Sequence, residues 1–176
     1  DARATAAAKT WRYFGAYVDE VSHFVTPKVV VQLRQAAKKP LREPAKVQIQ
    51  PECVSGGEMR DYQLKGLEFL ASMYDKGCNA ILGDEMGLGK TVQAIFAIQD
   101  YQQSQPVCRV LIVVPTSLKL NWKDEFSRWA PDIYVRLVEG NKRNRRALYM
   151  LPIPVLIASY EQIRIDSLNI SEANHI

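Results

Sequence analysis

The sequence contains few of the residues that form covalent or metal-bound frameworks. Among its 176 residues are 3 cysteines and 2 histidines. Cys53, Cys78 and Cys108 are widely spaced and have no histidine near them, whereas zinc sites and disulfide frameworks use short, regular spacings. We therefore expect neither a zinc site nor a disulfide framework, and we interpret all three cysteines as structural thiols.

Long apolar runs are also lacking. The longest one, Val110–Val114, is far shorter than the roughly 20 apolar residues that a helix needs to cross a bilayer. The N-terminal segment does not have the charged-then-apolar pattern of a secretion signal. We therefore expect no membrane association and no secretion, which leaves a cytoplasmic or nuclear location.

The composition is that of a folded domain with a small positive charge. Hydrophobic residues make up 47% of the chain, which is enough for a core, and the formal net charge is +4. Residues 1–60 carry 10 Lys and Arg against 6 Asp and Glu, while residues 61–176 carry 13 of each kind. A mildly basic protein of this kind is compatible with nucleic acid but does not require it.

The most informative segment is Gly83–Thr91, with the sequence Gly-Asp-Glu-Met-Gly-Leu-Gly-Lys-Thr. An apolar run predicted as a strand, residues 79–82, precedes it, and a predicted helix follows. Glycines in such a turn allow backbone N–H groups to face an anion, and the N-terminus of the helix favours negative charge there. Lys90 would then reach the outer phosphates of a nucleotide, and the Thr91 hydroxyl would bind Mg²⁺.

The strict phosphate-loop motif G-x-x-x-x-G-K-[ST] is not satisfied, because Asp84 occupies the position of the first glycine. A glycine-rich turn on the surface is one alternative, and a dinucleotide-binding turn that begins at Gly87 is another. The second lacks its third glycine, since that position holds Val92, and the strand that follows ends without the acidic residue that would hold a ribose. A phosphate loop is therefore the prediction.

The N-terminal part of the chain is predicted to be helical at first and then irregular. Apolar residues spaced by three and four predict an amphipathic helix in residues 1–25, which Pro27 would close. A proline-containing connector, residues 35–44, and a short alternating strand, residues 46–50, follow it.

We place the domain boundary near Ser55, which gives an N-terminal extension and linker of unknown role, residues 1–55, and a second domain, residues 56–176. The second domain starts with a predicted helix that Gly77 would end. Near the start of this helix, the side-chain amide of Gln63 could pair with an adenine edge, because it offers one donor and one acceptor. A surface glutamine is the simpler interpretation.

The rest of the second domain alternates strands and helices. Apolar segments at Val110–Val114, residues 133–138 and residues 155–160 predict strands, with helices between them. Such alternation indicates an α/β fold in three layers, in which a parallel sheet has helices on both faces. Trp122 and Trp129 lie on one side of a predicted helix and are interpreted as core residues.

Parallel sheets collect their ligands at the carboxyl ends of the strands. Besides the glycine-rich loop, two such ends offer hydroxyls, N–H groups and one lysine, in residues 115–119 and 158–161. A basic run is interpreted as a solvated loop, with phosphate contact as the alternative. Its members are Lys142, Arg143, Arg145 and Arg146.

Four short segments occur in a characteristic order. They are Met59-Arg-Asp-Tyr-Gln-Leu-Lys-Gly, Asp84-Glu-Met-Gly-Leu-Gly-Lys-Thr, Val113-Val-Pro-Thr-Ser-Leu with Asn121 and Trp122, and Ile157-Ala-Ser-Tyr-Glu. They are similar to the Q motif and motifs I, Ia and Ib of the Swi/Snf-like ATPases of helicase superfamily two, although Met replaces the usual Leu in the first and Ala-Ser replaces a common Thr-Thr in the last. From about Met59 to Asp166 the chain therefore resembles the first RecA-like P-loop NTPase lobe of that family.

The resemblance implies an ATP-driven translocase on double-stranded DNA that remodels protein–DNA complexes, usually without separating strands. It implies that Gln63 contacts adenine. It assigns ATP and Mg²⁺ to the phosphate loop, whose residues are Asp84, Glu85, Met86, Gly87, Leu88, Gly89, Lys90 and Thr91. It assigns the DNA track to Pro115, Thr116, Ser117, Lys119, Ser159 and Tyr160. Contacts to backbone phosphates would make binding sensitive to salt and insensitive to sequence.

The family's motif II, an Asp-Glu-x-His or Asp-Glu-x-Gln that binds magnesium and activates water, does not occur before Ile176. The second RecA-like lobe, which supplies arginines for phosphoryl transfer, is missing as well. We therefore expect the chain to be an incomplete first lobe, a fragment of a larger motor with the second lobe as its partner. On its own it is expected to hydrolyse ATP too slowly to be useful.

Two other functions stay open from the sequence. One is a strand-separating helicase of superfamily two, and the other is a non-catalytic adaptor that binds nucleotide. The complex acted on also stays open. It could be a nucleosome, for a nuclear remodeller of a eukaryote, or a stalled RNA polymerase, for a cytoplasmic motor of a bacterium.

Overall fold

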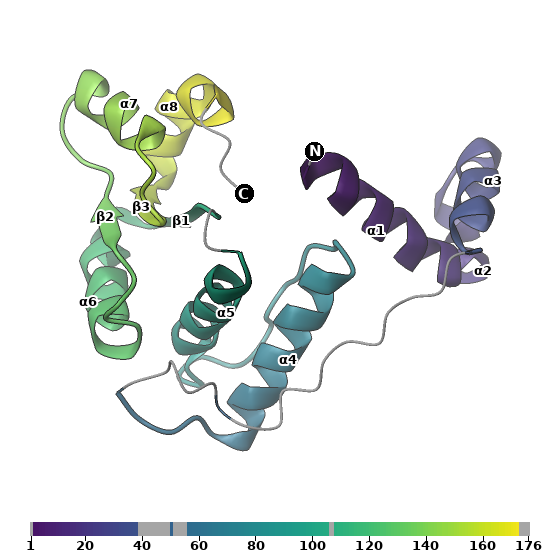
Figure 1. Ribbon diagram of the computed structural model, residues 1–176, viewed down its shortest axis with the longest axis horizontal. Helices are drawn as coiled ribbons and strands as arrows, with labels where there is room; N and C mark the ends of the chain where they lie inside the picture. Colours follow the sequence, from purple (N-terminus) through teal and green to yellow (C-terminus); the bar gives the residue numbers. More distant parts are fainter. Residues whose placement is uncertain (1, 39–49, 51–55, 106–107, 173–176) are drawn as a thin grey trace. The chain divides into compact units, whose positions relative to one another are not determined.

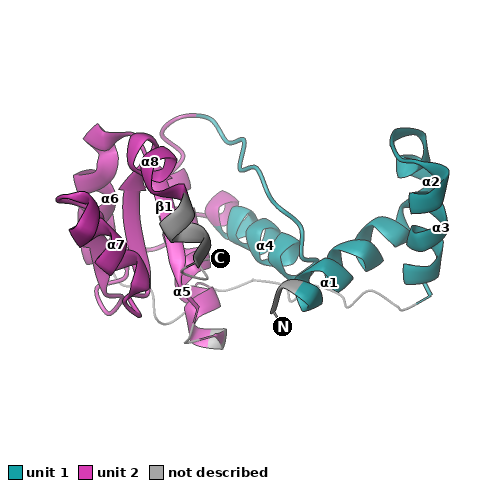
Figure 2. Cartoon of the chain, turned by 90° about the horizontal axis from the view of Figure 1, so that it is seen from above, with its two compact units in different colours: residues 1–48, 64–85 teal, residues 49–63, 86–176 magenta. Residues whose placement is uncertain are grey.

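The computed structural model describes residues 2–38, 50, 56–105 and 108–172 (Figure 1). The chain forms two compact units, one made of residues 1–48 and 64–85 and the other of residues 49–63 and 86–176 (Figure 2). The strand predicted at residues 46–50 lies outside the described residues except for Gln50. Within the described parts, no helix has both the length and the apolar character to cross a membrane.

The first unit is helical. It contains α1 (Ala2–Ala16), α2 (Val18–Val21), the 3-10 helix η1 (Ser22–Phe24), α3 (Pro27–Ala36) and most of α4 (Asp61–Asp75). Helices α1 and α3 pack against each other. A Cβ atom at Gly15 would lie 2.5 Å from the Leu33 carbonyl oxygen, so glycine is needed where these two helices meet.

Pro27 begins a helix instead of closing one, so the prediction of a single helix over residues 1–25 is wrong. The first helix ends at Ala16, and Tyr17 has the non-helical angles φ −114° and ψ 32°. Pro27 is the first residue of α3. Proline lacks an N–H group, which the first residue of a helix does not need, so it fits at a helix start as well as beyond a helix end.

Helix α4 is followed by a left-handed turn at Gly77, as predicted. Gly77 has φ +68°, and its N–H group donates to Tyr74 O at 2.9 Å, while the Cys78 N–H group donates to Met73 O at 2.9 Å. These two bonds form a Schellman motif, which favours glycine because the residue must be left-handed. The Thr10 hydroxyl of α1 donates to the Gly77 carbonyl oxygen in the same unit.

The segment before the phosphate loop is not a strand, so the prediction of a strand at residues 79–82 is wrong. Residues 78–85 form neither a helix nor a strand, and Ile81 is 89% exposed. A strand needs a hydrogen-bonded neighbour, and no described strand pairs with this segment. An apolar run alone does not supply that neighbour.

The second unit contains a three-stranded parallel sheet in the order β1-β3-β2. The strands are β1 (Val110–Val114), β2 (Val135–Leu137) and β3 (Val155–Ser159), close to the three predicted positions. The central strand β3 pairs with β1 from Val110↔Val155 to Val114↔Ser159. All five residues of β3 are buried, which accounts for its continuous run of small and apolar residues.

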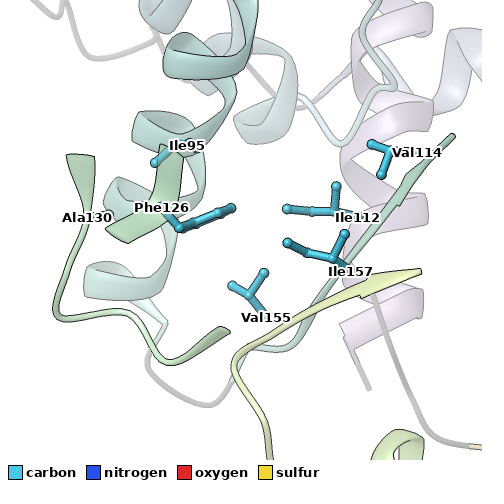
Figure 3. Close-up of a cluster of buried hydrophobic side chains, with 7 residues drawn as sticks. All are labelled: Ile95, Ile112, Val114, Phe126, Ala130, Val155 and Ile157. Carbon is cyan, nitrogen blue, oxygen red and sulfur yellow. The ribbon is translucent and has the colours of Figure 1, made fainter. Parts of the chain in front are cut away.

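Helices cover both faces of this sheet. On one face lie α5 (Lys90–Ser104) and α6 (Lys119–Trp129), and on the other lie α7 (Lys142–Met150) and α8 (Tyr160–Glu172). The first face encloses a core of Ile95, Ile112, Val114, Phe126, Ala130, Val155 and Ile157 (Figure 3). The second face encloses Val138, Tyr149, Ile153, Leu156 and Ala158. The predicted three-layer α/β fold is confirmed.

The two tryptophans of α6 pack as predicted. Trp122 and Trp129 are partly buried against the first core. The Trp129 ring meets the Phe96 ring edge-on, with ring centroids 5.7 Å apart, and its indole N–H group donates to the Glu125 carboxylate at 2.8 Å. The aromatic contact and the satisfied N–H group together fix the ring at the end of α6.

Candidate functional site

The phosphate loop, residues 84–91, leads directly into helix α5. Gly87 has φ +88° and Gly89 has φ +77°, angles that disfavour residues with a side chain. Gly89 immediately precedes the helix, whose first N–H groups have no partner within the helix. A Cβ atom at Gly87 would meet nothing within 4 Å, so the loop is open on that side. These features form a cradle for an anion at the positive end of the helix.

The side chains predicted to act on phosphate and magnesium stand at the start of α5. Lys90 and Thr91 are its first two residues, and both are half-buried. Met86, earlier in the loop, is 96% exposed. Asp84 and Glu85 belong to the first compact unit, whereas Met86 and the residues after it belong to the second.

Gln63 contacts the phosphate loop through the loop's backbone. Its Oε1 atom accepts from the Arg60 N–H group at 2.9 Å, and its Nε2 atom donates to the Leu88 carbonyl oxygen at 3.3 Å. A Cβ atom at Gly89 would lie 2.5 Å from Gln63 Nε2. The amide that was predicted to face adenine therefore lies beside the glycine that closes the loop.

A second glutamine at this loop was missed in the sequence. Gln93 is fully buried, and its Nε2 atom approaches the same Leu88 carbonyl oxygen at 3.5 Å. Two amides thus converge on the carbonyl group between the loop glycines. Its position in the sequence could have indicated this contact, because Gln93 is three residues after Lys90 and lies in the first turn of the helix that follows the loop.

A second candidate surface lies where β1 and β3 end, and we call residues 115–119 and 159–162 the strand-end edge. Val114 and Ser159 are partners in the sheet, so the two chain segments leave it side by side. Pro115, Thr116 and Ser117 are exposed, and Tyr160 is 59% exposed. These four of the six residues predicted for the DNA track are accessible together.

The other two residues predicted for the DNA track, Lys119 and Ser159, are buried. Lys119 is 5% exposed, and its Nζ atom donates to the Val138 carbonyl oxygen at 2.7 Å. Ser159 is 3% exposed, and its hydroxyl accepts from the Gln162 N–H group at 3.3 Å. Ser159 accepts from the first turn of α8, whose N–H groups need partners, whereas Lys119 bonds to the carbonyl group directly after β2.

Glu161 adds a negative charge to the strand-end edge, a feature that the sequence analysis missed. Hydrogen bonds from the Ser159 hydroxyl and from its own N–H group lower the pKa of this exposed carboxyl, and Thr116 and Arg164 act in the same direction. Thr116 Oγ1 lies 3.4 Å from Glu161 Oε2. The carboxylate is therefore charged at neutral pH, and it would repel an anion placed directly over it.

The basic run is part of a helix, so its interpretation as a solvated loop is wrong. Asn141 caps α7, because its side chain accepts from the Asn144 N–H group at 2.9 Å. Arg145 forms two hydrogen bonds with the fully buried Asp166 of α8, at 2.6 and 2.9 Å. Only part of the run therefore faces solvent. In the same helix, burial and the neighbouring Asp166 raise the pKa of Tyr149 to about 12.

The described cysteines carry free thiols. Cys78 is half-buried and Cys108 is buried, and burial raises the pKa of each thiol. Both thiols are therefore protonated at neutral pH, and the thiolate, which is the reactive form, is disfavoured. Cys53 lies outside the described residues.

Comparison with known proteins places these features in a family. The family described as SNF2-related domain matches residues 62–176. The protein CHROMATIN REMODELING 5 of Arabidopsis thaliana is 42% identical over 127 residues, which cover 72% of this chain and 7% of the plant protein. The nuclear protein STH1/NPS1 of Saccharomyces cerevisiae is 38% identical over 123 residues, which cover 67% of this chain and 9% of the yeast protein.

A solved structure agrees. The SWI2/SNF2 ATPase core of Sulfolobus solfataricus, in complex with dsDNA, matches with a TM-score of 0.59 and 25% sequence identity, covering 74% of this chain and 25% of that one. The chain spans between 7% and 13% of the length of the first curated relatives it matches. On these matches and its motifs, the chain belongs to the SNF2-related family, the Swi/Snf-like ATPases of helicase superfamily two.

Proposed function

We propose that this chain is the first ATP-binding lobe of an ATP-dependent translocase that moves on double-stranded DNA and remodels protein–DNA complexes. The observation that carries the proposal is the phosphate loop, in which Gly87 and Gly89 have positive φ and Lys90 and Thr91 follow at the helix start. Family membership supports it, as do relatives named as chromatin remodelling proteins and a related ATPase core solved with dsDNA.

ATP with Mg²⁺ fits the residues of the loop. The open side at Gly87 leaves room for phosphate oxygens, and the helix start supplies N–H donors. Lys90 would hold the outer phosphates, and the Thr91 hydroxyl would be a magnesium ligand. Bound ATP would supply the phosphoryl group whose transfer to water drives movement. The chain's own part is to bind and orient the ATP. Gln63 would contact both the loop and the adenine, and Asp84, Glu85 and Met86 would complete the loop.

The DNA track is proposed along the exposed part of the strand-end edge, at Pro115, Thr116, Ser117 and Tyr160. Hydroxyl and backbone N–H groups there suit phosphate oxygens of either strand and carry no base information. Glu161 would restrict where a phosphate can sit, because its carboxylate is charged. Binding should therefore depend on backbone geometry and weaken with salt.

The lobe is proposed to comprise residues 56–176 and to work with a second RecA-like lobe. Because no motif II sequence is present, the chain alone should bind nucleotide weakly and turn it over too slowly to measure usefully. The complex it remodels is proposed to be a nucleosome if the source is eukaryotic, with a nuclear location, or a stalled polymerase if it is bacterial, with a cytoplasmic one.

The test is the ATPase activity of the full-length protein with and without DNA. Duplex DNA should stimulate it more than single-stranded DNA does, and Lys90→Ala should lower the stimulated rate by at least about a hundredfold, because charge stabilisation at the transferred phosphoryl group is lost. Lys123→Ala removes an exposed lysine of α6 and is the matched control, expected to keep the wild-type rate. Displacement of an annealed strand would favour the helicase instead. Partner binding and cellular activity that survive Lys90→Ala would favour the adaptor.

A further inference from the structure

The buried lysine of the strand-end edge makes several polar contacts. Besides its 2.7 Å bond to Val138 O, Lys119 Nζ lies 3.4 Å from Gln162 Oε1 and 3.9 Å from the Glu139 carboxylate. Burial lowers the pKa of Lys119, and Glu139 opposes that change. A buried ammonium group is tolerated only when its donors are satisfied, so these contacts together hold Lys119 in place.

Gln162 is the second centre of the same cluster. Its Nε2 atom donates to the Val138 carbonyl oxygen at 2.8 Å, and its Oε1 atom accepts from the Ser159 N–H group at 2.9 Å. The Ser159 hydroxyl in turn accepts from the Gln162 N–H group. Ser-Tyr-Glu-Gln is therefore a capping box at the start of α8, extended by a bond to the end of another strand.

This cluster joins the carboxyl ends of all three strands. Lys119 comes after β1, Val138 directly follows β2, and Ser159 ends β3. Strands β1 and β2 are not neighbours, because β3 lies between them. The bonds of Lys119 and Gln162 to one carbonyl group therefore connect the turn after β1, the end of β2 and the first turn of α8.

We propose that Lys119 and Gln162 are positioning residues for DNA contact. They fix residues 115–118 and Tyr160, the exposed parts of the strand-end edge, relative to each other, while Lys119 itself does not touch DNA. This proposal rests on the proposed function. It differs from a direct phosphate contact by Lys119, which would require the ammonium group to leave its bond to Val138 O and reach solvent from a site that is 5% exposed.

The two roles predict different salt dependence. A lysine that binds a phosphate releases about one counterion, so its removal lowers the slope of log affinity against log salt by about one. A positioning lysine releases none, so its removal weakens binding without changing the slope. Gln162 carries no charge and can act only through position, so its removal should reproduce the loss if the two residues work together.

The experiment measures duplex DNA activation of the full-length protein. Lys119→Met keeps the apolar stem and removes the charge, and Gln162→Leu removes the amide. Each should raise the DNA concentration for half-maximal ATPase activity by about tenfold, since bonds to a charged or buried partner are lost. The salt slope should stay at the wild-type value, and the affinity for a fluorescent ADP analogue should stay within about twofold, as expected when changes act at separate sites. Lys123→Met on the same helix is the control, expected to match the wild type.

Three results would overturn the positioning role. The first is a salt slope reduced by about one in Lys119→Met together with wild-type behaviour of Gln162→Leu, which would make Lys119 a direct contact. The second is unchanged half-activation in both variants. The third is a parallel loss of ADP affinity, which would mean general destabilisation.

Amide hydrogen exchange separates this proposal from the proposed function. In Lys119→Met the N–H groups of Leu118 and Ser159 should exchange faster, while those of Ile95 and Phe96 in the core of α5 should not change. If the wild type does not respond to duplex DNA, the proposed function fails, and exchange still decides the positioning role. Unchanged exchange at Leu118 and Ser159 would overturn it.

Discussion

The phosphate loop and the strand-end edge are the two candidate surfaces of this chain, and they are built from different parts of it. The loop depends on backbone conformation, with positive φ at Gly87 and Gly89 and a helix start behind them. The strand-end edge depends on side chains, because bonds of Lys119, Ser159 and Gln162 link the segment after β1 to the ends of β2 and β3 from inside.

This difference decides how each surface responds to change. In the loop, Gly87 and Gly89 matter because they can adopt positive φ. Their neighbours in the sequence, Lys90 and Thr91, supply the side chains. In the strand-end edge, Lys119 and Gln162 bond to partners that are 19 to 43 positions away, so the surface depends on the packing of α6, α7 and α8 against the sheet. Substitutions behind the edge should therefore unfold it, whereas substitutions in the loop should impair binding.

The largest expected effect is on the ion pair that fastens α7 to α8 behind the strand-end edge. Arg145→Ala leaves the carboxylate of Asp166, which is 0% exposed, without its guanidinium partner. The free energy of unfolding should fall by about 3–5 kcal/mol, as is usual when one member of a buried pair is removed. Denaturant unfolding measures it. Arg143→Ala, an exposed residue of the same helix, should change stability by less than about 0.5 kcal/mol; similar losses in both variants would contradict a buried, structural pair.

An intermediate effect is expected when the two loop glycines are replaced one at a time. Gly87→Ala should weaken ADP binding through the left-handed backbone alone, which costs a residue with a side chain about 1–2 kcal/mol. The single variant Gly89→Ala should weaken ADP binding by about 0.5–1.5 kcal/mol more than Gly87→Ala does. The additional loss is expected because the new methyl group must displace the Gln63 amide, 2.5 Å away, from its bond to Leu88 O.

A double variant checks the reason for that difference. If displacement of Gln63 causes the additional loss, Gln63→Ala should weaken ADP binding in the wild type and have little further effect on Gly89→Ala. Gly87→Ala is the matched background, because its Cβ atom meets nothing within 4 Å and Gln63→Ala should keep its full effect there. Equal effects of Gln63→Ala in both backgrounds would mean that displacement of Gln63 does not cause the additional loss in Gly89→Ala.

Most of the fold follows from local patterns in the sequence. Short apolar runs between predicted helices identify β1, β2 and β3, and Gly77 marks the end of α4, because an apolar run and a left-handed cap are properties of short segments. The loop glycines could be predicted for the same reason. The family resemblance added the order of motifs and the name of the ligand.

The errors arose where a residue has two local meanings or needs a distant partner. Pro27 fits a helix start and a helix end equally well. Residues 79–82 fit a strand in composition, but they lack a paired neighbour among the described strands. Lys119 was assigned to the DNA track by the family resemblance, and its burial depends on a carbonyl partner at Val138, 19 residues away.

The capping role of Ser159 was missed although a local signal was present. The spacing Ser-x-x-Gln at residues 159–162 is a helix N-cap signature that can be read without the structure. The position of Ser159 at a strand end suggested a ligand contact instead. A residue at such a position can satisfy the next helix first, and its burial shows that it does so here.

The smallest expected effect tests that capping role. Ser159→Ala should lower the free energy of unfolding by about 1 kcal/mol, the usual loss when a helix cap is removed. Ser127→Ala is the matched control, because the Ser127 hydroxyl bonds to Lys123 O within its own helix and caps nothing, so a change below about 0.5 kcal/mol is expected.

A pH dependence tests a second contact of Ser159, the hydrogen bond from its hydroxyl to the Glu161 carboxylate. The Ser159 hydroxyl is the largest contribution to the lowered pKa of Glu161, so NMR titration should find that pKa higher in Ser159→Ala. A carboxyl whose pKa is lowered by folding stabilises the protein above its unfolded pKa, and this contribution disappears as pH falls through the folded one. The stability difference between wild type and variant should therefore be full at neutral pH and shrink in acid. A difference independent of pH, with an unchanged pKa of Glu161, would mean that Ser159 acts through the cap or through packing and does not stabilise the Glu161 carboxylate.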